Sequence, residues 1–67
     1  MRYFYITIEG FNLMGHKETI YMTYHGPNMF SKLDILIDAE SLCFLENPII
    51  TNWIELTQED YINFMRE

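Results

Sequence analysis

The last third of the chain reads Asn47-Pro48-Ile49-Ile50-Thr51-Asn52-Trp53-Ile54-Glu55-Leu56-Thr57-Gln58-Glu59-Asp60-Tyr61-Ile62-Asn63-Phe64-Met65-Arg66-Glu67. Pro48 suits the start or edge of a strand, and the β-branched and aromatic residues that follow favour one. Thr57 then has the chemistry of a helix N-cap, with Asp60 at the third helical position, close to a capping box. The stretch predicts a strand that runs directly into a short helix. About ten residues are too few for an independent helix, so its apolar stripe must dock on the sheet; that stripe is Tyr61, Phe64 and Met65.

The first 26 residues predict an antiparallel hairpin. Residues 2 to 9 and 18 to 25 both alternate with the period of two that is typical of half-buried strands. Residues 10 to 17 contain two glycines and an asparagine, which indicate a hairpin loop longer than the tight two-residue type. The alternation assigns one face to the aliphatic and aromatic side chains Phe4, Ile6, Ile8, Ile20, Met22 and Tyr24.

The middle of the chain, residues 29 to 42, favours a helix. Its apolar residues Phe30, Leu33, Leu36 and Ile37 have helical spacing, and Ser31 is a suitable N-cap. Residues 33 to 38 also resemble a strand, but the reach from the second strand to the third needs a crossover. Residues 41 to 47 fit either an extension of this helix or an apolar loop.

These elements predict a single α+β domain over residues 1–67 with the order β-β-α-β-α. The expected architecture is a small three-stranded sheet, antiparallel or mixed, with two helices on one face. The third strand fits beside the first, giving the order 2-1-3, or beside the second.

Residues 50–61, Ile-Thr-Asn-Trp-Ile-Glu-Leu-Thr-Gln-Glu-Asp-Tyr, follow a predicted hairpin and helix. This ending resembles that of a group of short uncharacterised proteins from Bacteroides-type gut bacteria and their mobile elements. The resemblance covers the last third in detail and the rest only in the order of elements. It implies a fold and supplies no catalytic residues.

Length and composition bear on partners. A chain of 67 residues buries a small share of its surface, and its one cysteine, Cys43, allows no internal disulfide. Hydrophobic residues make up 49%, so a homo-oligomer would supply burial that the monomer lacks. The net charge of −6 argues against direct binding to nucleic acid or to an anionic membrane. No targeting segment or spanning run is visible, and we expect a cytoplasmic protein.

The candidate functional surface is aromatic. Tyr3, Tyr5, Tyr21 and Trp53 are expected to share the sheet face opposite the aliphatic one, which helices on one side would leave exposed. Tyrosine and tryptophan are enriched in the centres of protein interfaces, so we expect a protein-protein contact, most simply with a second copy. The alternative is a set of cross-strand ring pairs with no further role.

Other candidate sites are weaker. His16, His25, Glu18 and Glu9 would form a minimal metal site if they converged, but solvated side chains near turns explain them more simply. Cys43 lies between Leu42 and Phe44 and is expected to be a small buried hydrophobe. We therefore expect no cofactor and no enzymatic activity. An alternative function, suggested by ten acidic residues, is an acidic inhibitor of a nucleic-acid-processing protein encoded by a mobile element.

Overall fold

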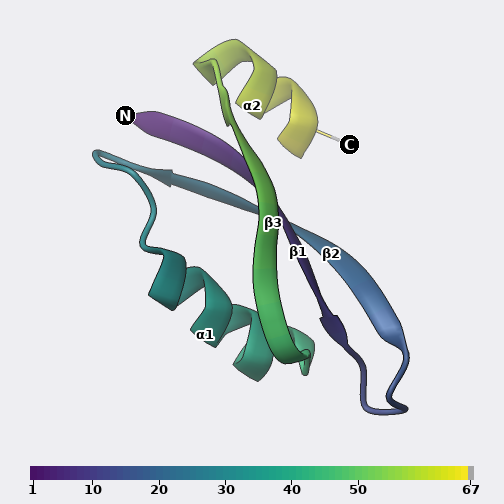
Figure 1. The fold of residues 1–67 in the computed structure, drawn as a ribbon. Helices are drawn as coiled ribbons and strands as arrows, with labels where there is room; N and C mark the ends of the chain where they lie inside the picture. The colour runs from purple at the N-terminus through teal and green to yellow at the C-terminus, as the bar shows by residue number, and fades with distance from the viewer. Residues whose placement is uncertain (67) are drawn as a thin grey trace.

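A computed structural model describes residues 1–66 and shows the order β-β-α-β-α (Figure 1). The elements are β1 (Arg2–Phe11), β2 (Lys17–Gly26), α1 (Lys32–Cys43), β3 (Glu46–Leu56) and α2 (Gln58–Met65). The strands form one antiparallel sheet in the order β2-β1-β3. The predicted α+β class and element order are confirmed, and the open question of strand order is resolved with β3 beside β1.

The hairpin between β1 and β2 is regular over the full length of both strands, from Arg2 opposite Gly26 to Phe11 opposite Lys17. Its turn is closed by Asn12, whose side-chain Oδ1 accepts hydrogen bonds from the backbone N–H groups of Met14 and His16 at 2.9 and 3.0 Å. Gly15 has a φ of 79°, a left-handed conformation that glycine adopts without steric cost. Because the turn chemistry is local, the loop could be recognised from sequence.

Helix α1 confirms the predicted crossover and its cap. The Ser31 hydroxyl accepts a hydrogen bond from the Asp34 N–H at 3.3 Å, which satisfies one donor of the first turn. The helix ends at Cys43, and Phe44 follows in the left-handed region with a φ of 54°. Leu45 then turns inward and is buried before β3 begins at Glu46. Residues 41 to 47 therefore contain the end of α1, its cap Phe44 and the start of β3 at Glu46.

The two helices lie on opposite faces of the sheet, so the expectation of two helices on one face is wrong. The core joins three β1 side chains to the α1 segment; its buried residues are Phe4, Ile6, Ile8, Phe30, Ile35, Ala39 and Leu45. We call this side the α1 face. Helix α2 instead packs against Tyr3 and Tyr5, which alternate with the core residues of β1.

The physical reason is that rings already occupy the end of the α1 face that α2 could have covered. Phe30 lies edge-on to Phe4, with ring centroids 5.2 Å apart, and edge-on to Trp53 at 5.8 Å. The stripe of α2 therefore meets the other face. Within α1, the inward side chains are Ile35 and Ala39, whereas Leu33 and Ile37, expected on the core side, are exposed.

Strand β3 contains a bulge that changes which face its side chains occupy. Asn52 is opposite Thr7, but Ile50 is opposite Ile8, so Thr51 is an extra residue. A second irregularity lies between Ile49 and Glu46 and includes Asn47, which has a φ of 50°. The alternation of the chain is therefore not continuous through β3.

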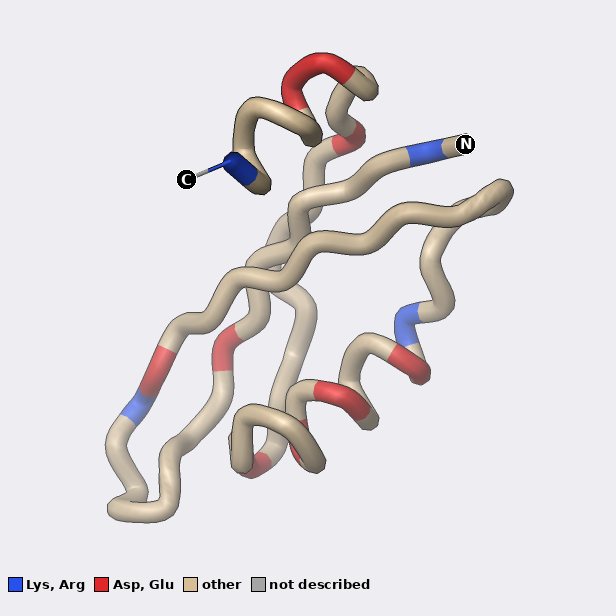
Figure 2. Tube along the Cα trace, turned by 180° about the vertical axis from the view of Figure 1, so that it is seen from behind, with Lys and Arg blue, Asp and Glu red and all other residues tan. Residues whose placement is uncertain are grey.

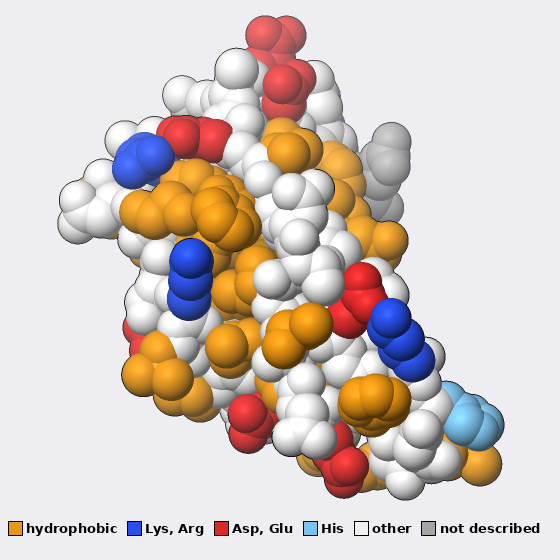
Figure 3. All heavy atoms as spheres, viewed as in Figure 1, with side chains coloured by type: hydrophobic (Ala, Val, Ile, Leu, Met, Phe, Trp, Pro, Cys, Tyr) orange, Lys and Arg blue, Asp and Glu red, His pale blue; other side chains and the backbone are white. Residues whose placement is uncertain are grey.

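The molecule is less compact than its size suggests. Its radius of gyration is 12.5 Å, against about 11 Å for a globular domain of this length. Its accessible surface is 4883 Å², against about 4,500 Å² expected from its mass. A space-filling view shows hydrophobic side chains in several separate exposed groups on the visible face (Figure 3). The lone chain thus leaves apolar surface that a partner could bury.

Candidate interaction surface

The sheet face opposite the α1 face carries three of the four predicted contact residues. Because β1 and β2 pair in register, Tyr3, Tyr5 and Tyr21 project to the same side, which we call the tyrosine face. The rings of Tyr5 and Tyr21 stack with centroids 5.5 Å apart and an interplanar angle of 4°. The predicted clustering of the three tyrosines is therefore present.

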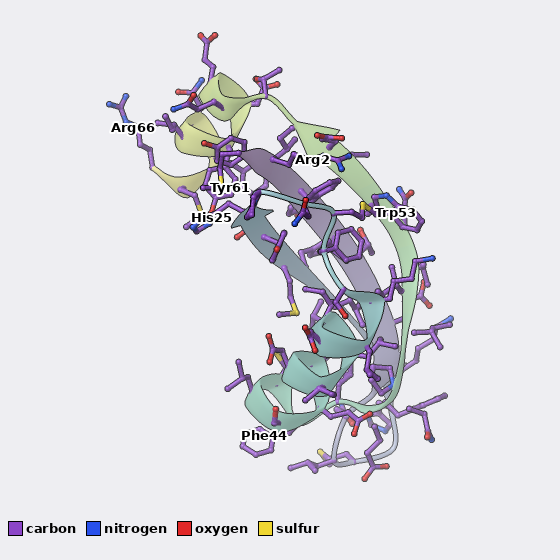
Figure 4. All side chains as sticks on the ribbon, turned by 90° about the vertical axis from the view of Figure 1, so that its left-hand side faces the viewer. Arg2, His25, Phe44, Trp53, Tyr61 and Arg66 are labelled. Atoms are coloured by element: carbon purple, nitrogen blue, oxygen red, sulfur yellow. The ribbon has the colours of Figure 1, made fainter. Side chains whose placement is uncertain are left out.

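Trp53 lies on the other side, and its predicted place on the aromatic face is wrong. It is opposite Ile6, packs edge-on to Phe30, and has the Lys32 ammonium 5.0 Å from its ring centroid. The cause is the extra residue Thr51, because adding one residue to a strand reverses the face of every later side chain. In Figure 4, Trp53 on β3 lies well away from the labelled pair His25 and Tyr61.

Helix α2 covers one end of the tyrosine face. The Thr57 hydroxyl caps it by accepting a hydrogen bond from the Asp60 N–H at 3.1 Å, as the sequence predicts. Its Tyr61 ring packs on Tyr3 with centroids 4.7 Å apart, and the Tyr61 hydroxyl is 3.0 Å from Nδ1 of His25. Figure 4 shows Tyr61 and His25 side by side next to α2.

Helix α2 covers only part of the tyrosine face. Phe64 contacts Tyr5 at a centroid separation of 4.7 Å, yet no residue of α2 is buried. Tyr21 stays 58% exposed and Ile54 50% exposed. We call the exposed apolar side chains of the sheet on this side the open part of the tyrosine face: Phe11, Tyr21, Ile49 and Ile54.

Ile54 belongs to this surface although the sequence pattern does not predict it there. Strict alternation counted from Ile50 puts Ile54 on the aliphatic face, but with the extra residue Thr51 Ile54 lies opposite Tyr5. Nothing in the local sequence marks Thr51 as an extra residue, so this error had no available signal. Phe64 could have been found, because it belongs to the predicted apolar stripe of the last helix.

Two ion pairs connect the strands on opposite faces. On the tyrosine face Lys17 Nζ lies 2.8 Å from Glu9 Oε1, and the hydrogen bond from this pair raises the pKa of Lys17. On the α1 face the Arg2 guanidinium makes two hydrogen bonds to the Glu55 carboxylate, at 2.9 and 3.0 Å. That pairing lowers the pKa of Glu55 and raises that of Arg2.

The residues of the candidate metal site do not converge. His16 and His25 are nine residues apart along one side of the hairpin, which places them about 30 Å from each other. Among residues 1–66, no three histidine, cysteine or acidic side chains form a group that could hold a metal ion. Cys43 is exposed at the end of α1, which corrects the expectation that it is buried.

The acidic residues are spread over the molecule. Figure 2 shows them on both helices and on all three strands. This distribution gives the inhibitor hypothesis no support, because that function needs carboxylates gathered where a basic partner would bind.

Neither helix in the described part of the chain has the length and hydropathy of a membrane span. No protein-family model, curated protein or solved structure matches the chain. The resemblance of residues 50–61 to the Bacteroides-type group therefore stays a prediction.

Proposed function

We propose that this protein is a non-enzymatic protein-protein interaction module that self-associates through the open part of the tyrosine face. The single observation that supports this most is the incomplete cover of that face. Helix α2 shields Tyr3 and the edge of Tyr5, while Tyr21, Ile49 and Ile54 stay at least half exposed on one side of the sheet. A cytoplasmic location belongs to the same proposal.

The balance of burial supports a partner of the same chain. Seven hydrophobic side chains are buried in the described residues, whereas sixteen large ones are exposed. Small domains without disulfides or metals commonly gain the missing burial by oligomerisation. A second copy is always present at the same concentration, so it is the simplest partner that could provide it.

The chemistry of the surface favours protein over nucleic acid. Stacked tyrosines could receive unpaired bases, but that mode also needs cations along the path of the backbone. Lys17, at the start of β2 on this face, is already paired with Glu9, and the net charge of the chain is −6. Tyrosine rings with flanking aliphatic side chains match the centre of a protein interface.

Sedimentation equilibrium over a wide concentration range tests the proposal. The wild type is expected to exceed its monomer mass of 8.1 kDa as concentration rises, and Tyr21→Thr, which keeps a good strand former, is expected to weaken that association. Leu33→Gln is the matched control, because Leu33 is exposed on the outer side of α1 and should not change it. A wild type that stays monomeric throughout would overturn the proposal.

A further inference from the structure

The outer edge of β2 is a long unpaired strand edge. β2 lies at one side of the sheet and pairs only with β1 over Lys17–Gly26. Within residues 1–66, no backbone hydrogen bond outside the helices and ladders uses a residue between 17 and 26. An edge of this length presents a row of free N–H and C=O groups to any strand that can approach it.

The alternation of the ladder identifies which groups are free. The Asn12 N–H donates to the His16 carbonyl at 2.9 Å, and this pair continues the hairpin register. In an antiparallel ladder hydrogen-bonded pairs alternate with non-bonded ones, so the even-numbered residues of β2 bond to β1. The odd-numbered residues Thr19, Tyr21, Thr23 and His25 therefore direct their N–H and C=O groups outward.

The opposite edge of the sheet is protected in ways that the β2 edge is not. β3 carries Pro48, which lacks an N–H, together with the bulge at Thr51 and the left-handed residue Asn47. Proline and bulges are the usual devices that prevent edge pairing. From residue 19 to residue 24, β2 contains no proline, glycine or charge in a chain of net charge −6.

We propose that two copies of this chain pair their β2 edges antiparallel about a two-fold axis at Tyr21, forming a continuous six-stranded sheet. This inference rests on the proposed self-association, and of the open part of the tyrosine face it brings Tyr21 into the contact, while Ile49 and Ile54 lie on β3 at the opposite edge of the sheet. The segment Thr19-Ile20-Tyr21-Met22-Thr23 is nearly palindromic around its central residue.

Antiparallel pairing at that register places chemically similar side chains opposite each other. On the tyrosine face, Thr19 meets Thr23 of the second copy. On the α1 face, Ile20 meets Met22 of the second copy. The odd-numbered residues meet as hydrogen-bonded pairs, which uses the groups that β1 leaves free. Tyr21 meets its own copy on the tyrosine face, so the stacked pair Tyr5–Tyr21 would continue across the axis.

The first test removes a hydrogen bond from the edge. Thr19→Pro deletes an outward N–H, a change that edge strands tolerate, and Thr19→Val keeps that N–H and the β-branched shape. In sedimentation equilibrium we expect Thr19→Pro to weaken the dimer about tenfold or more, because each two-fold contact loses two hydrogen bonds. Thr19→Val should associate like the wild type, and both should retain the wild-type far-ultraviolet circular dichroism.

The outcomes separate this inference from the proposed function. A dimer that is weakened by Tyr21→Thr and unaffected by Thr19→Pro would overturn edge pairing while self-association through the tyrosine face stands. A wild type that never dimerises would overturn both and would leave the edge to a strand of another protein.

A second test uses cross-linking and does not depend on the folding of the proline variant. In a Cys43→Ser background, Thr19→Cys together with Thr23→Cys places two cysteines opposite their partners, within the Cα distance that a disulfide spans. Oxidation should then give a covalent dimer at twice 8.1 kDa. The single variant Thr23→Cys faces Thr19 of the other copy and should stay largely monomeric. Equal cross-linking in both variants would overturn the register.

Discussion

The α1 face and the tyrosine face are presented by alternate residues of the same strands, yet they are covered to different degrees. Under α1, Phe4, Ile6 and Ile8 are almost fully removed from solvent. Under α2, tyrosines are covered by rings, and no residue of the helix is buried. Interdigitating aliphatic side chains exclude water, whereas an eight-residue helix over amphipathic rings covers only part of a face. We infer that the α1 face provides the stability of the monomer and that the tyrosine face is available for a partner.

The largest expected effect compares one residue from each face. Ile6→Ala removes a side chain of 0% exposure from the core and should lower the free energy of unfolding by about 2–5 kcal/mol. Ile54→Ala, at a half-exposed position, should cost less than about 1 kcal/mol. Urea unfolding at low protein concentration measures both. Equal losses would show that the two faces contribute equally.

A second substitution tests the close packing of the α1 face. A Cβ at Gly10 would lie 2.6 Å from Leu45 Cγ and 2.9 Å from the Glu46 carbonyl oxygen. Gly10→Ala should therefore destabilise the protein by about 1–3 kcal/mol through overpacking. Gly15→Asn is the control for the close contact, because its surroundings are open and asparagine bears the positive φ with less strain than other side chains, so a smaller loss is expected. Thermal unfolding of the two variants should separate them clearly, and a neutral Gly10→Ala would contradict tight packing there.

A third change loosens the cover of the tyrosine face and leaves the core in place. Thr57→Ala removes the N-cap of α2 and should cost about 1 kcal/mol. The ring resonances of Tyr3 and Tyr5 in NMR spectra should shift as Tyr61 and Phe64 move away. Ser31→Ala removes the equivalent cap of α1 and should leave those resonances in place. Shifts of the same size in both variants would mean that the two faces are coupled.

The smallest effect concerns the exposed Arg2–Glu55 pair on the α1 face. The hydrogen bond from Arg2 lowers the pKa of Glu55, so the pair's contribution is present above the ordinary carboxyl range and is lost as pH falls through the lowered pKa. The Tm difference between wild type and Glu55→Gln should be largest near pH 7 and should vanish in strong acid. High salt should reduce it as well. A difference independent of pH would assign the effect of the substitution to packing.

The hairpin, the crossover helix and both helix caps could be predicted because each depends on residues close together in the chain. Ser31 caps through Asp34, and Thr57 caps through Asp60, three residues away in each case. The face occupied by α2 could not be predicted in this way. It depends on Phe30, in the segment before α1, packing against Trp53 of β3, a contact between residues distant in sequence.

The candidate site was predicted in part for the same reason. The three tyrosines lie in a regular hairpin, where counting by two is valid, so their common face was predictable. Trp53 lies beyond an extra residue whose position is set by pairing with β1, so counting by two fails there. Leu33 and Ile37 have helical spacing with Phe30, but the direction in which α1 docks exposes them. Spacing alone does not give that direction.

Single-residue changes in length will not be tolerated equally along this chain. Loss of Thr51 would restore strict alternation in β3 and leave every other residue opposite its partner on β1, whereas a residue gained or lost between Asn52 and Leu56 would turn the later side chains to the other face. A residue gained or lost at the Asn12–His16 turn would change only a surface loop. Natural relatives of this protein are therefore expected to vary in length at the hairpin tip and to keep a constant number of residues between Asn52 and Leu56.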